Sequence, residues 1–351
     1  MCTTEKHMIV IGAGIMGASI AYHLASRGIK VTVIDKSQPA SGATGSSFGW
    51  IHTTVSDDAP DAFLRRASVA DWQRLEKEIP EFWVNWTGAL SYDDETLESQ
   101  PNENCLRQPE ISQLEPALNH PPQQAYFAVD DGAVDPIDAT RTLLEKACSL
   151  GATLKSQTSA IGFLRNGNHV TGIQTPEGVL NADAVILACG TGITPLLNTI
   201  GIPLSILASP AILLRYSTAN HLINTLISGP DVEVRHARNG DILAAEDYPL
   251  SGNAVNVAAE TLAAIKIGLN DADSVSLLSQ SVGQRPVPED GCPIIGFIDD
   301  IPGVYVAVMH PAVTCAATVG RMVSEELISG YNPEIPEIYR PARFISLQKQ
   351  P

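Results

Sequence analysis

The sequence predicts a mixed α/β fold, and three stretches carry the prediction. Residues 8–36 have the pattern of an apolar strand, a glycine turn, a helix and a second apolar strand. Residues 182–188 are another apolar run, which ends at Cys189–Gly190. Residues 209–245 alternate short apolar runs with Gly, Asn and Asp turns, as antiparallel strands do. With 351 residues, of which 44% are hydrophobic, the chain can bury the cores of two closely joined domains.

The first stretch predicts a dinucleotide-binding βαβ unit. Gly12, Gly14 and Gly17 form a G-x-G-x-x-G turn between the first strand and the helix. Asp35 ends the second strand about twenty residues after the turn, where an acid that binds ribose is expected. The helix N-terminus then offers backbone N–H groups to a pyrophosphate. A glycine-rich strand–helix turn without a ligand is the alternative.

Composition excludes several classes of function. A formal net charge of −17 disfavours nucleic acid and anionic membrane as partners. The six cysteines are scattered, with no C-x-x-C pair and no His/Cys cluster at metal-ligand spacing, so no metal site or disulfide scaffold is expected. No apolar run could span a bilayer, and no signal-peptide segment precedes the first strand. We therefore expect a cytoplasmic protein with reduced thiols.

The remaining elements follow from periodicity and turn residues. Residues 37–52 are rich in Gly, Ser and Ala and are expected to be a loop whose hydroxyls bond a ligand. Helices are expected at 58–79, capped by Asp58 or Asp61, and at 137–150, 252–269 and 311–329. Strands are expected at 126–129, 153–164, 170–175, 274–285, 294–298 and 304–308.

Only one glycine turn of this kind follows a strand, whereas reductases that pass electrons between NAD(P)H and a flavin usually carry two. The nucleotide is therefore NAD(P) itself, or FAD that is reduced by a substrate.

Four stretches, taken in order, resemble the D-amino-acid oxidase superfamily of flavoproteins, most closely its glycine oxidase and sarcosine oxidase branch. They are IGAGIMGASIAYHLASRG, GAVDPIDATRTLLEKACSLGA, ADAVILACG and GQRPVPEDGCPIIG with the helix that follows it. The resemblance covers nearly the whole chain. It implies a FAD-binding Rossmann-like domain of the glutathione reductase type and a second α+β domain with an antiparallel sheet for the substrate. The first domain would comprise residues 1–80, 136–205 and 283–345, and the second residues 81–135 and 206–282.

The resemblance implies FAD rather than NAD, bound without a covalent link because SVGQRPV has no cysteine. The family's loop under the isoalloxazine ring corresponds to residues 41–51. Its Gly-His stretch before the last helix corresponds to residues 309–314, where Met309 and Thr314 replace glycines. The helix N-terminus there would stabilise the reduced flavin. The residues implied to contact FAD are Gly12, Gly14, Ile15, Met16, Gly17, Asp35, Lys36, Ser41, Thr44, Ser47, Gly49, Trp50, Ala160, Gly190, His310, Val313 and Thr314.

The same resemblance assigns Arg285, in the segment GQRP, to the carboxylate of the substrate. A guanidinium group pairs with both carboxylate oxygens and so fixes the orientation of the molecule. A surface ion pair at a strand end is the alternative role. His52, beside the flavin loop, and Tyr248, in the β-rich segment, are candidate polar groups of the pocket.

The implied reaction is hydride transfer from the Cα–H of a small amino or imino acid to flavin N5, after which the imine is hydrolysed. No protein base is required if the amine binds in its neutral form.

The second hypothesis is a dehydrogenase, or the flavin subunit of a heteromeric amine or opine dehydrogenase, that passes electrons to a partner or a quinone. It arises because Lys266, in a helical pattern, is expected to be solvated rather than to lie over the flavin. An NAD(P)-dependent dehydrogenase and a non-catalytic nucleotide sensor are alternatives from other classes. The residues leave open the substrate, the electron acceptor and the oligomeric state, between a homo-oligomer and a subunit of a heteromer.

Overall fold

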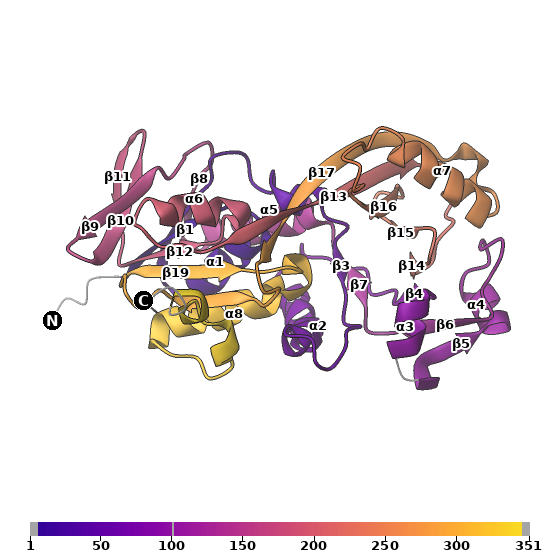
Figure 1. Ribbon diagram of the computed structural model, residues 1–351, viewed down its shortest axis with the longest axis horizontal. Coiled ribbons are helices and arrows are strands. Elements are labelled where there is room, and N and C mark those ends of the chain that lie inside the picture. Colours follow the sequence, from indigo (N-terminus) through magenta and orange to yellow (C-terminus); the bar gives the residue numbers. More distant parts are fainter. Residues whose placement is uncertain (1–5, 100–101, 346–351) are drawn as a thin grey trace.

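The first apolar run forms β1 (His7–Ile11) inside a six-stranded sheet of the computed structural model, which describes residues 6–99 and 102–345 (Figure 1). The side chains of β1 alternate between two cores. Met8 and Val10 pack against helices, whereas Ile9 and Ile11 pack on the opposite face. The sheet runs in the order β18 (Ile294–Phe297), β19 (Val304–Val308), β12 (Ala184–Leu187), β1, β2 (Lys30–Ile34), β8 (Thr153–Lys155). Neighbouring strands are parallel except β18, which is antiparallel to β19.

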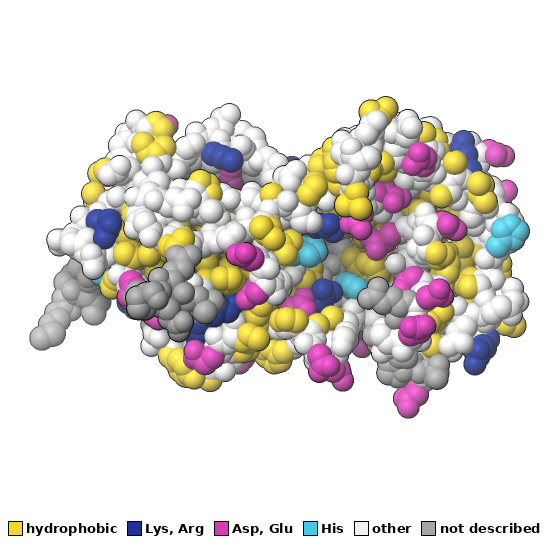
Figure 2. Space-filling model, viewed as in Figure 1, with side chains coloured by type: hydrophobic (Ala, Val, Ile, Leu, Met, Phe, Trp, Pro, Cys, Tyr) yellow, Lys and Arg dark blue, Asp and Glu magenta, His cyan; other side chains and the backbone are white. Residues whose placement is uncertain are grey.

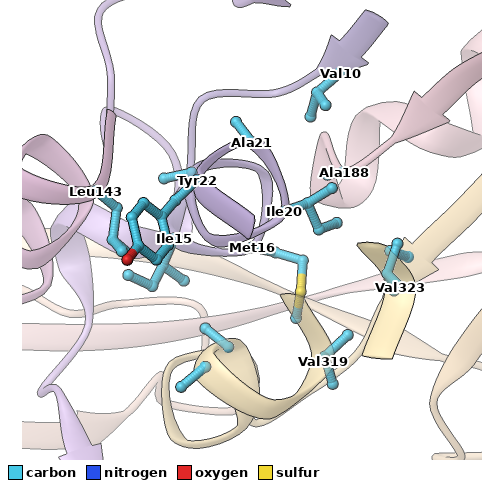
Figure 3. Close-up of a cluster of buried hydrophobic side chains, with 14 of the residues drawn as sticks. Val10, Ile15, Met16, Ile20, Ala21, Tyr22, Leu143, Ala188, Val319 and Val323 are labelled. Carbon is cyan, nitrogen blue, oxygen red and sulfur yellow. The ribbon is translucent and has the colours of Figure 1, made fainter. Parts of the chain in front are cut away.

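Helices cover one face of this sheet. The layer consists of α1 (Ile15–Ala25), α5 (Pro136–Ser149) and α8 (Ala312–Ser329), with α2 (Ala62–Glu78) packed on α8. Every residue of α1 is buried. Met16 of α1 points toward Val319 of α8, and Leu143 of α5 lies beside Tyr22 (Figure 3).

The opposite face is covered by α6 (Ile193–Asn198) and a three-stranded sheet in the order β11 (Gly178–Asn181), β10 (His169–Thr175), β9 (Gly162–Asn166).

An eight-stranded sheet forms the other half of the elongated molecule, and the long strands β13 and β17 connect the halves (Figure 1). Its two faces differ. Ile212, Leu214 and Tyr216 pack toward α7 (Val257–Gly268), whereas Leu213 packs with Phe48 and Trp50 on what we call the substrate-side face. The order is β17 (Ser276–Pro288), β13 (Ile206–Ser217), β16 (Ile242–Asp247), β15 (Glu233–His236), β14 (Leu226–Ser228), β4 (Ala89–Ser91), β6 (Gln124–Ala128), β5 (Cys105–Arg107).

Short elements complete the described chain. A two-stranded ribbon, β3 (Trp50–Ile51) with β7 (Gly132–Ala133), lies between the two large sheets (Figure 1). The others are η1 (Ala43–Ser46), α3 (Asp94–Ser99), η2 (Asn102–Asn104), α4 (Gln108–Leu114), η3 (Gly190–Gly192), η4 (Ala272–Ser274), η5 (Glu337–Tyr339) and α9 (Ala342–Ile345).

The predicted fold class is confirmed: a parallel Rossmann-like sheet is joined to an antiparallel sheet with helices. The division into domains stays a prediction. The strand β17 runs from Ser276 to Pro288 and so crosses the boundary placed at residue 283. The strand expected at 274–285 continues through Pro286 and Pro288, because β17 lies at the edge of its sheet, where proline is tolerated. Cys2 lies outside the described residues.

Three local expectations need correction. The strand expected at 153–164 is two strands, because β8 pairs with β2 while β9 pairs with β10. The segment 37–52 is not all loop, since it contains η1 and β3. Asp61 occupies the N-cap of α2, but its carboxylate accepts a hydrogen bond from Arg65 Nε, 2.7 Å away, and does not cap the helix.

Candidate active site

The glycine turn lies at the carboxyl end of β1, against the end of β12. Gly12 has φ +110°, and a Cβ added there would lie 2.5 Å from the carbonyl oxygen of Ala188. A Cβ on Gly17 would lie 1.9 Å from the carbonyl oxygen of Gly12. Gly14 is the N-cap of α1 and provides no side-chain cap. The backbone N–H groups at the start of α1 and a turn without side chains fit the pyrophosphate of a dinucleotide.

The predicted ribose acid is tied to this turn. The two oxygens of the Asp35 carboxylate accept hydrogen bonds from the backbone N–H groups of Ala13 and Ser37, both at 2.8 Å. The backbone N–H of Thr158 donates to the Asp35 carbonyl oxygen at 2.8 Å, which brings the segment of Ala160 alongside. Cys189 also lies nearby. Burial, with a smaller contribution from the Asp35 charge, raises the pKa of its thiol to about 12.

The structure thus brings the turn together with Asp35, the Ala160 segment and Gly190, which follows Cys189. Lys36 and Ser41 are exposed beside them. The side chains of Ile15 and Met16 are buried in the helix core, so these residues can meet a ligand only through their backbone (Figure 3).

The loop predicted to run under the flavin crosses the start of α1. The hydroxyl of Thr44 accepts a hydrogen bond from the Ile15 N–H at 3.1 Å. The Ser47 hydroxyl accepts a hydrogen bond from the Gly49 N–H at 3.3 Å. The Gly49 carbonyl accepts one from Val134 N–H at 2.9 Å. The loop is therefore fixed at both ends, to α1 and to the segment before α5.

Arg235, on β15, holds the middle of this loop and was not predicted from the sequence. Its side chain is 3% exposed and donates to the carbonyl oxygens of Phe48 at 2.8 Å, Val134 at 3.0 Å and His236 at 3.0 Å. Burial lowers its pKa to about 10. The sequence signal that could have identified Arg235 is its place in the strand segment E-V-R-H, because alternate residues of a strand point to the same face of the sheet.

Trp50 and His52 follow the loop and contact the start of α8. Their rings stack with centroids 4.1 Å apart, and Trp50 Nε1 donates to Asp131 at 2.8 Å. Burial raises the pKa of Asp131 to about 6. The Thr314 hydroxyl donates to the Trp50 carbonyl at 3.0 Å and accepts from the His52 N–H at 3.4 Å. Thr314, one of the two departures from the family glycines, therefore joins α8 to β3.

Arg65 lies close to His52 and influences both histidines of the site, His52 and His310. Its Nη1 is 3.2 Å from His52 Nδ1, and its Nε binds Asp61. Burial and then the Arg65 charge lower the pKa of His52 to about 3. Desolvation and then the charges of Arg285 and Arg65 lower the pKa of His310 to about 4. Both rings are neutral near pH 7. Since guanidinium only donates, the neutral His52 ring carries its proton on Nε2.

The start of α8 lies against these groups. Val313 is 8% exposed in the first turn, and Pro311 at the N-cap provides no side-chain cap. The helix N-terminus is thus free of side-chain partners, as expected where a helix meets a polar ligand edge.

Arg285 lies at the substrate-side end of β17. Its Nη2 donates to Ser209 at 3.0 Å and pairs with Asp247 at 3.2 Å. The side chain of Arg285 is 33% exposed and that of Asp247 is 89% exposed. Among the described residues, Arg285 Nε is the buried side-chain polar atom that has no hydrogen-bond partner. A buried donor without a partner is rare in folded proteins, so Arg285 Nε is a candidate contact for a ligand.

Strand register places further charges on the same face. Cross-strand partners lie on one side of a sheet, so the pairs Ser209–Arg285, Ala211–Asp247 and Glu233–Ala245 locate these side chains. Glu233 was not predicted; burial and then the charges of Glu246 and Asp247 raise its pKa to about 7. Figure 2 shows histidines, cations and acids around a hollow between the two halves of the molecule.

Tyr248 is not brought to this face. It packs with the cluster on the α7 side, and its hydroxyl donates to the Gly252 carbonyl at 3.3 Å. The structure thus gathers Arg285, His52 and His310 but places Tyr248 across the sheet from them.

Comparisons with known proteins agree with this geometry. A family model described as "DAO: FAD dependent oxidoreductase" matches residues 7–326. A glycine oxidase of Pseudomonas aeruginosa is 25% identical over 96% of this chain and 99% of its own. An uncharacterized oxidoreductase of Bacillus subtilis, YurR, is 25% identical over 86% of this chain and 89% of its own.

Solved structures share the fold. A glycine oxidase from Bacillus cereus superposes with a TM-score of 0.83 at 22% identity, covering 93% of this chain and 95% of its own. An L-proline dehydrogenase from P. horikoshii superposes with a TM-score of 0.84 at 24% identity, covering 97% and 98%. Within residues 6–99 and 102–345, no helix has the length and apolar character needed to cross a membrane.

Proposed function

The chain belongs to the DAO family of FAD-dependent oxidoreductases, and from this premise we propose that it oxidises the C–N bond of a small amino or imino acid. Membership makes the chain an enzyme with FAD as its cofactor, so NAD(P) and a non-catalytic sensor are set aside.

One observation carries the proposal: the guanidinium of Arg285 is only partly satisfied. Its Nε has no partner, and its Nη2 pairs with Asp247, whose side chain is largely exposed. An incoming carboxylate can take the place of Asp247 and satisfy Nε as well, because a guanidinium group binds carboxylate through two parallel N–H donors. A carboxylate held there fixes the orientation of the rest of the substrate.

The residues present fit FAD. The side-chain-free turn at Gly12 and Gly14, Thr44 at the start of α1 and Asp35 would hold the dinucleotide part, and residues 47–50 and 310–314 would hold the flavin. When bound, FAD supplies the oxidant that accepts the hydride from the substrate Cα–H.

The protein's own residues bind and orient. Arg285 holds the carboxylate, and neutral His52 presents an Nε2–H donor at the wall formed with Trp50. The imine that leaves the site is hydrolysed by water.

Replacing Arg285 tests this role. We expect Arg285→Ala to keep its FAD but to lose about 100-fold or more in kcat/KM, because truncating one side of a charge-assisted pair costs about 2–5 kcal/mol. Arg285→Lys should recover part of the loss, since it keeps the charge without the fork. Arg141→Ala, which removes an exposed arginine of α5, is the matched control. An Arg285→Ala variant with unchanged kinetics would refute the carboxylate assignment.

A dehydrogenase that passes electrons to a partner or a quinone is the second candidate, and Lys266 is the observation that favours it. Lys266 lies on α7, on the far face of the eight-stranded sheet, and its Nζ donates to the Asp273 carbonyl at 3.2 Å. It is thus not positioned to assist oxygen chemistry on the substrate-side face. Reoxidation of the reduced protein should then be slow in air and fast with a quinone; fast reoxidation in air would establish an oxidase.

A further inference from the structure

We propose that Glu233 binds the ammonium group of the substrate and accepts the proton that the amine must lose before oxidation. This inference rests on the proposed function, because it assumes that Arg285 holds the carboxylate of the same molecule. It adds a residue that acts on the nitrogen, where the sequence predicted none.

The register of the sheet directs Glu233 toward the site. Glu233 pairs with Ala245, so the two side chains share a face, and Ala245 packs in the cluster that contains Phe48 and Trp50. Two residues further along β15, on the same face, Arg235 donates to the Phe48 carbonyl. Glu233 therefore faces the loop that precedes Trp50 and His52.

The carboxylate of Glu233 differs from its acidic neighbours in having no partner. Throughout the part of the chain that the structure describes, no hydrogen bond or ion pair reaches it. Glu246, the next acid on the sheet, accepts a hydrogen bond from Thr261 at 2.8 Å on the α7 side. Asp247 is paired with Arg285. A half-buried carboxylate without a partner, on the face that carries an unpartnered arginine nitrogen, is suited to a ligand with a positive group.

The charges around Glu233 suit a group that exchanges a proton near neutral pH. Glu246 and Asp247 on β16 raise its pKa in addition to burial, and Arg285 on β17 lowers it, for a value of about 7. Arg235 is the other charged residue on the same face of β15. An acceptor with a pKa near the working pH transfers protons most effectively.

An α-amino acid presents its two charged groups to these residues at once. With the carboxylate on Arg285, the ammonium group lies within a few bonds, on the face that also carries Asp247 and Glu233. In the step proposed, one N–H bond of the ammonium breaks and one O–H bond forms on Glu233 Oε. The electron pair stays on nitrogen, where it is needed to form the C=N bond, and no oxidant takes part.

A binding measurement without turnover tests the first half of the proposal. Holoenzyme kept reduced without air cannot oxidise its ligand, so calorimetry can compare sarcosine with butanoate and glycine with propanoate. Each pair differs by replacement of the amine nitrogen with carbon. We expect the protein to bind the amino acid at least about 10-fold more tightly than its isostere. Glu233→Gln should reduce this ratio to about 2-fold or less, and Glu246→Gln should leave it unchanged.

The pH dependence of flavin reduction tests the second half. The rate with sarcosine should fall on the acid side as Glu233 becomes protonated, and Glu233→Gln should lose that limb while Glu246→Gln keeps it. An unchanged preference ratio or an unchanged acid limb in Glu233→Gln overturns the proposal. So does a loss confined to amino acids with a second amino group, which would assign Glu233 to a side chain of the substrate.

The results distinguish failure of the Glu233 proposal from failure of the proposed function. If Arg285→Ala weakens both members of each pair but Glu233→Gln changes nothing, the proposed function stands and the inference falls. If the reduced wild-type holoenzyme binds none of the four carboxylates, both fall together.

Discussion

The glycine turn and the substrate-side face differ in what holds their residues in place. The turn is built by backbone from one short stretch, with Gly12 and Gly17 in contact with other backbone atoms and Asp35 bonded back to Ala13. The substrate-side face takes Glu233, Asp247 and Arg285 from three strands, and it leaves Arg285 Nε without a hydrogen-bond partner and the Glu233 carboxylate without a partner among the described residues. The shape of the first region is therefore fixed by the chain itself, whereas the second region contains a buried nitrogen, Arg285 Nε, that has no partner in the protein.

This difference separates stability from chemistry in the two regions. Changes at the turn should act through packing and so remove the cofactor and the fold together. Changes on the substrate-side face should leave the cofactor bound and alter the substrate. A variant at the turn that keeps its fold but loses substrate, or a variant on the substrate-side face that loses FAD, would contradict this division.

The largest effect is expected at Gly17. A methyl group in Gly17→Ala would lie 1.9 Å from the Gly12 carbonyl oxygen, a contact that forces α1 away from the turn. We expect little or no FAD in the purified variant and a large loss of thermal stability. Gly268→Ala is the matched control, because this glycine is also in a helix, as the last residue of α7, and has no atom within 4 Å of an added Cβ. That control should match wild type or gain up to about 1 kcal/mol. A yellow, stable Gly17→Ala protein would contradict the packing argument.

The turn could be predicted from sequence because its parts lie within one stretch and its residue types are dictated by backbone geometry. Gly12, Gly17 and Asp35 have few physical alternatives at those positions. The parallel strands could be predicted from the sequence equally well, because strands that are buried on both faces have continuous apolar runs such as residues 184–187.

The charged groups of the site could not be predicted in the same way. Arg235 holds the carbonyl of Phe48, 187 residues earlier in the chain, and a lone arginine in a strand does not name so distant a partner. The position of Tyr248 could not be predicted from the sequence either. It follows the last residue of β16, Asp247, and its side chain packs on the α7 side, so its place in the β-rich segment did not indicate which face it occupies.

Arg235 provides the next prediction, because it joins the two regions. Arg235→Met leaves the carbonyls of Phe48, Val134 and His236 without this donor. We expect a loss of about 2–4 kcal/mol in the free energy of unfolding, measured by denaturant titration, and weaker FAD binding. Arg238→Met is the control, since Arg238 is exposed and lies 5.2 Å from the centre of the Trp83 ring. Equal stabilities of the two variants would show that the loop does not depend on Arg235.

The pH dependence of stability gives a smaller effect. The pKa of His52 is about 3 in the folded protein against 6.5 for an ordinary histidine, so between these values the unfolded chain binds a proton that the folded protein does not. Stability is therefore present above pH 6.5 and is lost as pH falls, by at most about 1.4 kcal/mol per pH unit for this group. Asp131, with a pKa near 6, contributes the opposite slope below that pH.

The comparison of variants isolates the His52 contribution. His52→Gln should show a flatter fall in melting temperature between pH 6.5 and 4 than wild type, and His120→Gln, at an exposed position, should follow wild type. Parallel curves for wild type and His52→Gln would mean that His52 is not held neutral.

The smallest effect is expected at Tyr248. Its hydroxyl contacts the Gly252 carbonyl on the α7 side, away from Arg285. Tyr248→Phe should change kcat/KM by less than about 2-fold and stability by about 0.5 kcal/mol or less, as surface substitutions usually do. A larger loss of activity would show that Tyr248 acts in the pocket and would contradict its placement on the α7 side of the sheet.

The visible absorption spectrum of the purified protein, followed during anaerobic addition of glycine, sarcosine, D-alanine and L-proline, tests whether the chain is an FAD enzyme whose Arg285 holds the substrate carboxylate. We expect a yellow protein that releases its FAD on denaturation and bleaches with at least one of these compounds. We also expect an Arg285→Ala variant that is equally yellow but does not bleach at the same concentration. A colourless protein that takes up no FAD, or a variant that bleaches as readily as wild type, would contradict this assignment.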